Sequence, residues 1–291
     1  MTDKLIKAVA FDGEVRITAV DATGTVQEAQ KKHDTWSAST AALGRTLVGT
    51  LMMGSDIKDD AKITVQINGN GPAGKLVAVA DGQGNVKGYV QEPHISLDPN
   101  DKGKIDVRGA VGTEGLFTIT KDLGLKEPFS GQVPIVSGEI AEDFTYYLAY
   151  SEQTPSAVGL GVLVDTDETV INAGGWMIQL MPGVTEPSIE AVEKAVAETP
   201  QVTELLSDGA TAKDMINRLL GEENVKFLDE RDVQFACDCN KDRFAAGLAT
   251  LPKEEITAMI EEDNGAEVVC QFCNKRYQFT AEDLKGIEDQ A

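Results

Sequence analysis

Four cysteines, all in the last fifth of the chain, are the residues whose type and spacing most clearly indicate chemistry. They form two close pairs, Cys-Asp-Cys at 237–239 and Cys-Gln-Phe-Cys at 270–273. Two tight turns would bring four thiolates together, and an all-sulfur tetrahedral site in a protein usually holds zinc. We therefore expect a Zn²⁺ site whose ligands are Cys237, Cys239, Cys270 and Cys273.

The main alternative is that these cysteines are free or disulfide-bonded. The second pair has the spacing of a common metal-binding turn, whereas the single residue between Cys237 and Cys239 requires a cramped one. No histidine ligand accompanies the pairs, so the pattern does not indicate a hydrolytic zinc site. The Cys-x-x-Cys pair also lacks the helix-opening context of a thioredoxin motif.

The residues around the cysteines favour a site that responds to oxidants. Lys241 and Arg243 follow the first pair, and Lys275 and Arg276 follow the second, in a segment that is otherwise acidic. Basic neighbours would keep the sulfurs thiolate-like, and thiolates are the forms that oxidants attack. An oxidised sulfur is no longer a thiolate ligand. Because the last segment has few apolar residues, its stability should depend on the metal, which predicts a redox switch.

The chain before these pairs predicts an α+β body over residues 1–182. Alternating apolar residues separated by glycine-bearing turns indicate an antiparallel sheet. The strands expected from this pattern include Glu14–Val20, Lys62–Ile67, Lys75–Ala80 and Leu116–Thr120. Two helices, Asp34–Met53 and Glu139–Glu152, interrupt the strands.

Residues 183–224 predict a helical connector. Its expected helices are Glu186–Glu198, Thr203–Leu206 and Thr211–Leu220, the last with a capping box from Thr211 to Asp214 and a stop at Gly221. Each helix is too short to be stable alone and needs an apolar surface. Two interpretations remain open: permanent packing on the body, or conditional packing that exposes apolar side chains on release. The side chains concerned are Leu205, Leu206, Ile216, Leu219 and Leu220.

Residues 225–291 predict a small zinc-binding domain. We expect a helix at Lys253–Glu262 and a hairpin at Val268–Phe279 that carries the second cysteine pair at its turn. Thr280 and Asp283 should cap a final helix. The sequence therefore predicts three parts: body, connector and zinc-binding redox-switch domain.

Composition limits the classes of partner and activity. The net charge is −22, from 48 acidic and 26 basic residues, which should repel nucleic acid and anionic membranes, so neither is expected as a partner. We find no apolar run of about 18 residues and no export signal, and expect a cytoplasmic protein. The glycine-rich stretch 69–74 reads as a turn, and His33 and His94 as surface residues. With no nucleophile–base pair in recognisable context, we expect no catalytic residues and no enzyme.

Two body segments extend the pattern to the whole chain. They are Ser-Glu-Gln-Thr-Pro-Ser-Ala at 151–157 and Gly-Gly-Trp-Met-Ile-Gln-Leu-Met-Pro-Gly at 174–183. Together with the Cys-x-Cys and Cys-x-x-Cys pairs, in this order and spacing, they make the chain similar to the heat-shock protein 33 family of redox-regulated holdase chaperones.

The resemblance implies a reduced, zinc-bound form of low activity. It also implies an oxidised form in which Cys237 pairs with Cys239 and Cys270 with Cys273, and from which zinc is released. The tail and connector would then lose order, a homodimer would be favoured, and unfolding client proteins would be held without ATP. The alternative function is a zinc-ribbon adaptor in which the metal is purely structural.

Overall fold

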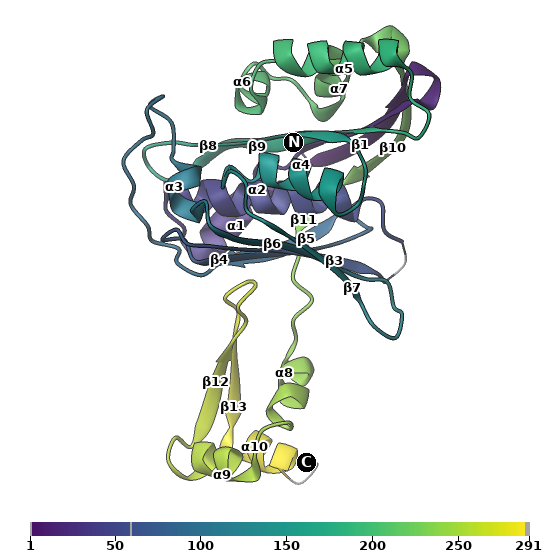
Figure 1. The fold of residues 1–291 in the computed structure, drawn as a ribbon. Helices are drawn as coiled ribbons and strands as arrows, with labels where there is room; N and C mark the ends of the chain where they lie inside the picture. Colours follow the sequence, from purple (N-terminus) through teal and green to yellow (C-terminus); the bar gives the residue numbers. More distant parts are fainter. Residues whose placement is uncertain (1, 59, 289–291) are drawn as a thin grey trace. The chain divides into compact units, whose positions relative to one another are not determined.

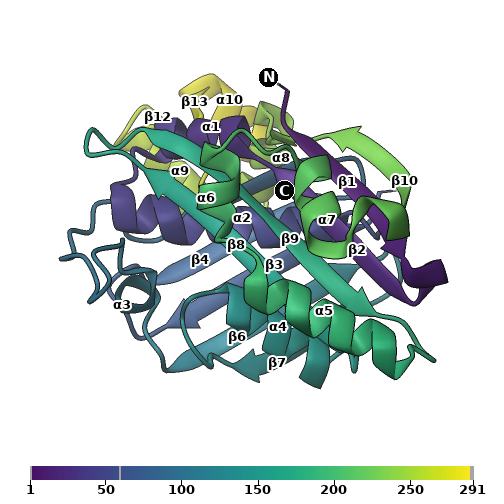
Figure 2. The same cartoon turned by 90° about the horizontal axis from the view of Figure 1, so that it is seen from above.

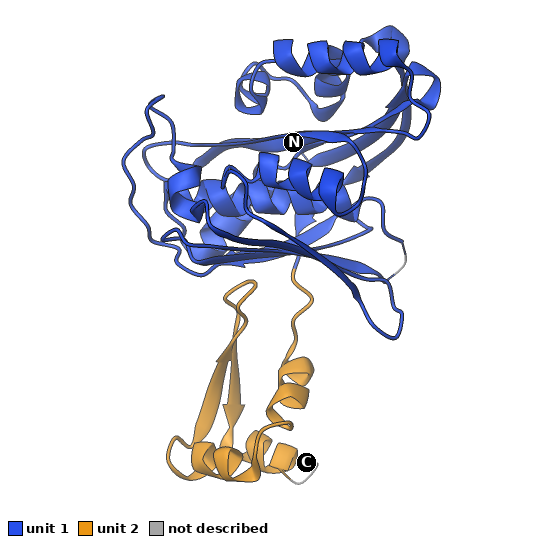
Figure 3. Cartoon of the chain, viewed as in Figure 1, with its two compact units in different colours: residues 1–236 blue, residues 237–291 orange. Residues whose placement is uncertain are grey.

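A computed structural model describes residues 2–58 and 60–288 of the chain. The chain forms two compact units, residues 1–236 and residues 237–291 (Figure 3). The first contains two sheets and most of the helices, and the second contains all four cysteines. In the part of the chain that the structure describes, no helix has the length and apolar character needed to cross a membrane.

The first unit consists of runs of strands separated by helices, labelled in Figure 1. In chain order they are β1 (Lys4–Ala10), β2 (Val15–Asp21), α1 (Thr23–His33), α2 (Ser37–Gly54), β3 (Lys62–Gly69), β4 (Lys75–Asp81), β5 (Asn85–Val90), α3 (Val107–Val111), β6 (Gly115–Asp122), β7 (Phe129–Pro134), α4 (Ala141–Tyr150), β8 (Ser156–Val164), β9 (Val170–Leu180), α5 (Glu186–Glu198), α6 (Val202–Ser207), α7 (Ala212–Leu220), β10 (Val225–Asp232) and β11 (Gln234–Phe235). Two short 3-10 turns, Phe11–Gly13 and Glu222–Asn224, complete the set.

The strands form two sheets that confirm the antiparallel prediction. One sheet has the order β10-β1-β2-β9-β8, and the other has the order β11-β5-β4-β3-β6-β7. Every pairing is antiparallel except the short one between β11 and β5. In β3, Ile63, Val65 and Ile67 alternate with polar residues and are fully buried, as a strand with one face on the core requires. The glycine-rich stretch at 69–74 is the turn between β3 and β4, as predicted.

Helix α2 lies between the two sheets (Figures 1 and 2). Sixteen of its eighteen residues are buried, which its composition permits because Arg45 is its only charged residue. Arg45 forms an ion pair with Glu139 at 2.7 Å. Gly49 allows close contact with α4, since a Cβ there would lie 2.3 Å from the ring of Phe144. The sequence therefore placed this helix correctly, but Trp36 precedes it and is exposed.

One buried carboxylate holds the segment 136–140, which precedes helix α4. Asp143 is fully buried, and its two oxygens accept hydrogen bonds from the backbone N–H groups of residues 136, 137, 138 and 140 at 2.8–3.1 Å. The helix itself buries Phe144, Tyr147 and Leu148, the residues predicted to share one face. Charge-assisted hydrogen bonds to Asp143 thus tie the turn before α4 to the first turn of that helix.

Helices α5, α6 and α7 form a layer on the face of the five-stranded sheet that points away from α2 (Figures 1 and 2). We call this the helical layer. Its apolar side chains pack on residues of β1, β2 and β9. Four of the five named from the sequence are buried there, Leu205, Ile216, Leu219 and Leu220, and Leu206 is partly buried. In this structure the layer is therefore docked, and its release remains a hypothesis.

The ends of α7 are those that the sequence predicted. The Thr211 hydroxyl accepts a hydrogen bond from the Asp214 N–H at 3.2 Å, and the Asp214 carboxylate accepts one from the Thr211 N–H at 2.9 Å. Gly221 ends the helix with a φ of +78°, a conformation that glycine adopts without strain. The capping box is confirmed.

The second unit folds around a hairpin. Its elements are α8 (Lys241–Leu248), α9 (Lys253–Glu261), β12 (Gly265–Val269), β13 (Arg276–Thr280) and α10 (Ala281–Glu288). The predicted hairpin, with the second cysteine pair at its turn, and the cap between Thr280 and Asp283 are confirmed. Among its described residues, 237–288, the buried hydrophobic core besides the cysteines consists of five residues: Leu248, Ile256, Tyr277, Phe279 and Leu284.

Two strands near residue 230 lie in the first unit. β10 pairs with β1 and β11 pairs with β5, so the compact units do not share their bounds with the parts expected at 1–182, 183–224 and 225–291. As a division into separately folding parts, the three-part scheme stays a prediction.

The expectation that His33 is a surface residue was wrong. His33 is buried at the end of α1, a helix that the sequence analysis missed, and its ring meets the edge of Phe235 at 6.4 Å. It shares a helix face with Val26 and Ala29 at i, i+3 and i+7 spacing, which carries it into the core. His94 is exposed as predicted and lies 3.1 Å from Asp34.

Candidate metal centre

All four cysteines gather at one point of the second unit. Their sulfur atoms lie within 4.8 Å of one another. Two contacts join the pairs: Cys237 Sγ lies 3.8 Å from Cys270 Sγ, and Cys239 Sγ lies 3.4 Å from Cys273 Sγ. Cys270 and Cys273 are buried, whereas Cys237 and Cys239 are half-buried. The pairs therefore form one four-sulfur cluster, as the spacing predicted.

Two tight turns place these sulfurs. At the hairpin turn, the Cys270 carbonyl accepts hydrogen bonds from the Cys273 N–H at 3.3 Å and from the Asn274 N–H at 2.8 Å. Asn274 has a φ of +56°, which asparagine tolerates better than most residues. At the first pair, the Asn240 side chain accepts from the Arg243 N–H at 2.8 Å and begins α8 directly after Cys239.

Tyr277 is an aromatic residue that contacts one of the four cysteines. Its hydroxyl lies 3.2 Å from Cys239 Sγ and 2.9 Å from the Cys239 carbonyl oxygen. The ring is buried and packs on Phe244 at 5.1 Å between ring centres. The sequence analysis missed this residue. The available signal was its inward position on the alternating strand β13, shared with Phe279.

The surroundings give the four sulfurs different acidities. Burial raises the pKa of Cys237 and of Cys273 by more than the backbone N–H groups of Cys239 and Lys275 lower them. Burial also raises the pKa of Cys239, but hydrogen bonds from the Tyr277 hydroxyl and the other thiols outweigh it and lower that pKa to about 7. The same hydrogen bond raises the pKa of Tyr277. Cys239 is therefore a sulfur that carries negative charge readily near neutral pH.

Three of the four basic side chains that follow the cysteine pairs form ion pairs with carboxylates, and the fourth lies over an aromatic ring. Lys241 bonds to Asp283 at 2.9 Å. Arg243 lies 3.3 Å from Asp238. The remaining two are Arg276, which pairs with Glu267 at 2.6 Å, and Lys275, which lies over the Tyr277 ring at 5.1 Å. The Tyr277 hydroxyl and the backbone N–H groups of Cys239 and Lys275 are hydrogen-bond donors to the sulfurs.

The cluster meets the requirements of a tetrahedral metal site. Zinc–sulfur bonds of about 2.3 Å imply sulfur–sulfur edges of about 3.8 Å in a regular tetrahedron. The two sulfur–sulfur contacts between the pairs, 3.8 and 3.4 Å, are close to that edge, and all the sulfurs lie within 4.8 Å of one another. Four soft donors suit zinc and leave no position for a catalytic water. The four-cysteine cluster could therefore bind a metal ion.

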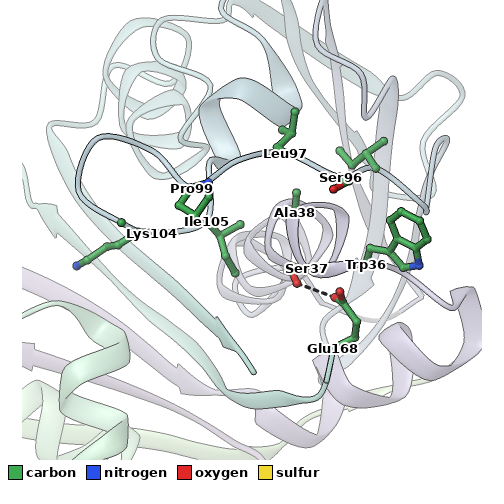
Figure 4. A pocket seen from close by; sticks show the side chains of 11 residues that line it. Trp36, Ser37, Ala38, Ser96, Leu97, Pro99, Lys104, Ile105 and Glu168 are labelled. Atoms are coloured by element: carbon green, nitrogen blue, oxygen red, sulfur yellow. Dashed lines mark hydrogen bonds between the residues drawn. The ribbon is translucent and has the colours of Figure 1, made fainter. Parts of the chain in front are cut away.

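A pocket in the first unit has different chemistry. It has a volume of about 230 Å³ and lies between the start of α2 and the loop that follows β5 (Figure 4). Trp36, Leu97 and Ile105 contribute apolar walls, and the Ser37 hydroxyl donates to Glu168 at 2.6 Å. It contains no sulfur and is not part of the thiol site.

Comparison with known proteins agrees with this fold and cluster over the full length. A family model described as Hsp33 protein matches residues 3–280. The 33 kDa chaperonin of Enterococcus faecalis is 56% identical over 291 residues, covering 100% of this chain and 98% of that protein. The one from Shouchella clausii is 52% identical over 291 residues, covering 100% and 99%. The crystal structure of the 33 kDa chaperonin from Thermotoga maritima superposes with a TM-score of 0.93 at 37% identity, covering 100% of this chain and 99% of that one.

The antiparallel α/β body and the C-terminal four-cysteine cluster together define a redox-regulated chaperone and not an enzyme. A chaperone implies client proteins as partners. The chain belongs to the Hsp33 family, the 33 kDa chaperonins.

Proposed function

We propose that this chain is an ATP-independent holdase of the cytoplasm, active during oxidative stress, whose switch is the oxidation of four zinc ligands. The ligands are Cys237, Cys239, Cys270 and Cys273. The observation that most supports this proposal is the gathering of all four sulfurs within 4.8 Å.

The reduced ligands hold the second unit together. They join the segment before α8 to the turn of the β12–β13 hairpin, parts of the chain that are more than thirty residues apart. Bound zinc would neutralise charge between these thiolates and contribute about 10–16 kcal/mol to folding. Over residues 237–288 the apolar core has five buried residues besides the cysteines, which is small, so the unit depends on its ligands for stability.

Oxidation removes the ligands one pair at a time. A thiolate attacks hydrogen peroxide, gives a sulfenic acid and releases hydroxide; a second thiol then displaces the oxygen as water and forms a disulfide. We propose the pairs Cys237–Cys239 and Cys270–Cys273. A sulfur in a disulfide can no longer act as a thiolate ligand, so the unit loses the constraint that folds it.

The functional consequence is the release of the helical layer. β10 follows α7 and pairs with β1, so the segment between the helical layer and the second unit includes the edge strand of the sheet on which the layer docks. Undocking would expose the apolar faces of α6, α7 and the five-stranded sheet, a surface suited to unfolded polypeptides. We propose that clients bind there and that a homodimer forms in this state.

The test is suppression of aggregation of a chemically unfolded protein at equal chain concentrations. We expect suppression after peroxide treatment and little while the chain is reduced and zinc-loaded. Cys237→Ser should suppress aggregation without peroxide, because one ligand is lost. An adaptor with a purely structural metal would instead be inactivated by both treatments, and that result would refute the proposal.

A further inference from the structure

The hydroxyl of Tyr277 lies between two acceptors of the same residue. It is 2.9 Å from the Cys239 carbonyl oxygen and 3.2 Å from Cys239 Sγ. One hydroxyl proton serves the stronger acceptor of the two. A thiolate accepts a charge-assisted hydrogen bond, whereas a thiol or disulfide sulfur is a weak acceptor. The hydroxyl therefore favours the thiolate form of Cys239 over its oxidised form.

The geometry points to Tyr277 as the positioning residue that sets how readily the cluster oxidises, because its hydroxyl holds Cys239 Sγ as a metal ligand and lowers its reactivity toward peroxide. This inference rests on the proposed zinc switch and deepens it. Hydrogen bonds to ligand atoms orient them and tune the metal site. A hydrogen-bond donor to a thiolate also withdraws electron density from the sulfur. The sulfur is then a weaker nucleophile toward peroxide.

The same hydroxyl keeps an acceptor while Cys239 is being oxidised. When Cys239 becomes part of a disulfide, the carbonyl oxygen at 2.9 Å remains as an acceptor. Formation of the disulfide thus leaves no buried hydroxyl unpaired before the unit loses its fold, and the hydrogen bond to the thiolate stabilises only the reduced state. Its loss should shift the balance toward oxidation without a compensating penalty.

The matched variants are Tyr277→Phe and Phe244→Leu in the full-length chain. Tyr277→Phe removes one oxygen and keeps the ring in the core beside Leu248 and Phe279. Phe244→Leu loosens the ring contact on Tyr277, at 5.1 Å, but leaves the hydroxyl in place. The pair separates the hydrogen bond from general packing.

Three measurements follow. In the reduced, Co²⁺-loaded chain, the thiolate-to-cobalt charge-transfer band should move to lower energy in Tyr277→Phe only, because the sulfur lone pair loses its donor. Zinc affinity, measured by competition with a chelator in reducing buffer, should fall about 10- to 100-fold in Tyr277→Phe. With zinc saturating, Cys239 should be oxidised by peroxide faster in Tyr277→Phe than in the wild type, as mapped by mass spectrometry.

An unchanged band and affinity in Tyr277→Phe would overturn the inference, as would equal effects in Phe244→Leu. A wild-type chain that gives no thiolate-to-cobalt band at all would instead refute the proposed metal site. The two failures are therefore distinguishable.

Discussion

Replacing Ile216 by alanine should undock the helical layer in the reduced chain. Ile216 is fully buried on α7 and packs in a cluster with residues of β1, β2 and β9. Truncating a buried isoleucine to alanine costs about 2–5 kcal/mol. α7 has nine residues and cannot remain helical alone, so this cost falls on the docked state. At about 2 kcal/mol, the undocked fraction rises about 30-fold.

Hydrogen exchange on the reduced, zinc-loaded chain measures this change. Amides of residues 215–220 should exchange about 30-fold faster or more in Ile216→Ala, while those of β3 and β6 in the other sheet keep their wild-type rates. The variant should also suppress client aggregation partly without peroxide. Arg218→Ala is the control, since Arg218 is exposed on the same helix.

Two results would refute the reasoning. If Ile216→Ala accelerated exchange equally in α7, β3 and β6, the layer would open only with the whole first unit. If it accelerated exchange in α7 but gained no activity against aggregation, the undocked surface would not be the one that binds clients.

Further predictions concern the cap, the buried turn, and the metal. Thr211→Ala should lower the free energy of docking by about 1 kcal/mol, giving about fivefold faster exchange in α7. Hydrogen bonds from Thr211 lower the pKa of Asp214 below its ordinary 3.8, so this cap stabilises α7 above that pH and is lost in acid. The difference between wild type and Thr211→Ala should therefore shrink below pH 3.8, and a constant difference would contradict the assigned cap. Asp143→Asn should destabilise the first unit by about 3 kcal/mol in urea denaturation, because the amide loses two acceptor positions for backbone N–H groups, while an unchanged midpoint would contradict this role. Chelation of the metal in reducing buffer should abolish the protection of β12 and β13 amides and leave β3 and β6 protected; retained protection of β12 and β13 would show that the hairpin needs no metal.

Local sequence signals predicted most helices and the cysteine hairpin. The capping box at Thr211 and Asp214, the stop at Gly221 and the cap at Thr280 act within four residues, so the chain segment alone specifies them. The two cysteine pairs were recognisable as possible metal ligands because their short spacings are typical of tight turns. The gathering of both pairs followed from their chemistry rather than from any local pattern.

Contacts between distant residues were the part that the sequence did not reveal. Tyr277 and Cys239 are 38 residues apart, and only the packing of the hairpin beside α8 brings the hydroxyl to the sulfur. β10 pairs with β1 from the other end of the chain, which assigns residues 225–232 to the first unit. α1 was missed because its apolar face is short: Val26 and Ala29 are the only strongly apolar residues that it buries.

The central claim is that loss of the thiol ligands is what activates the chain. Peroxide titration of the zinc-loaded protein, with metal release and aggregation suppression followed in the same samples, tests it most directly. We expect suppression to rise in proportion to the metal released, and reductant with added zinc to reverse both. Suppression that reaches its maximum while the metal remains bound would contradict it.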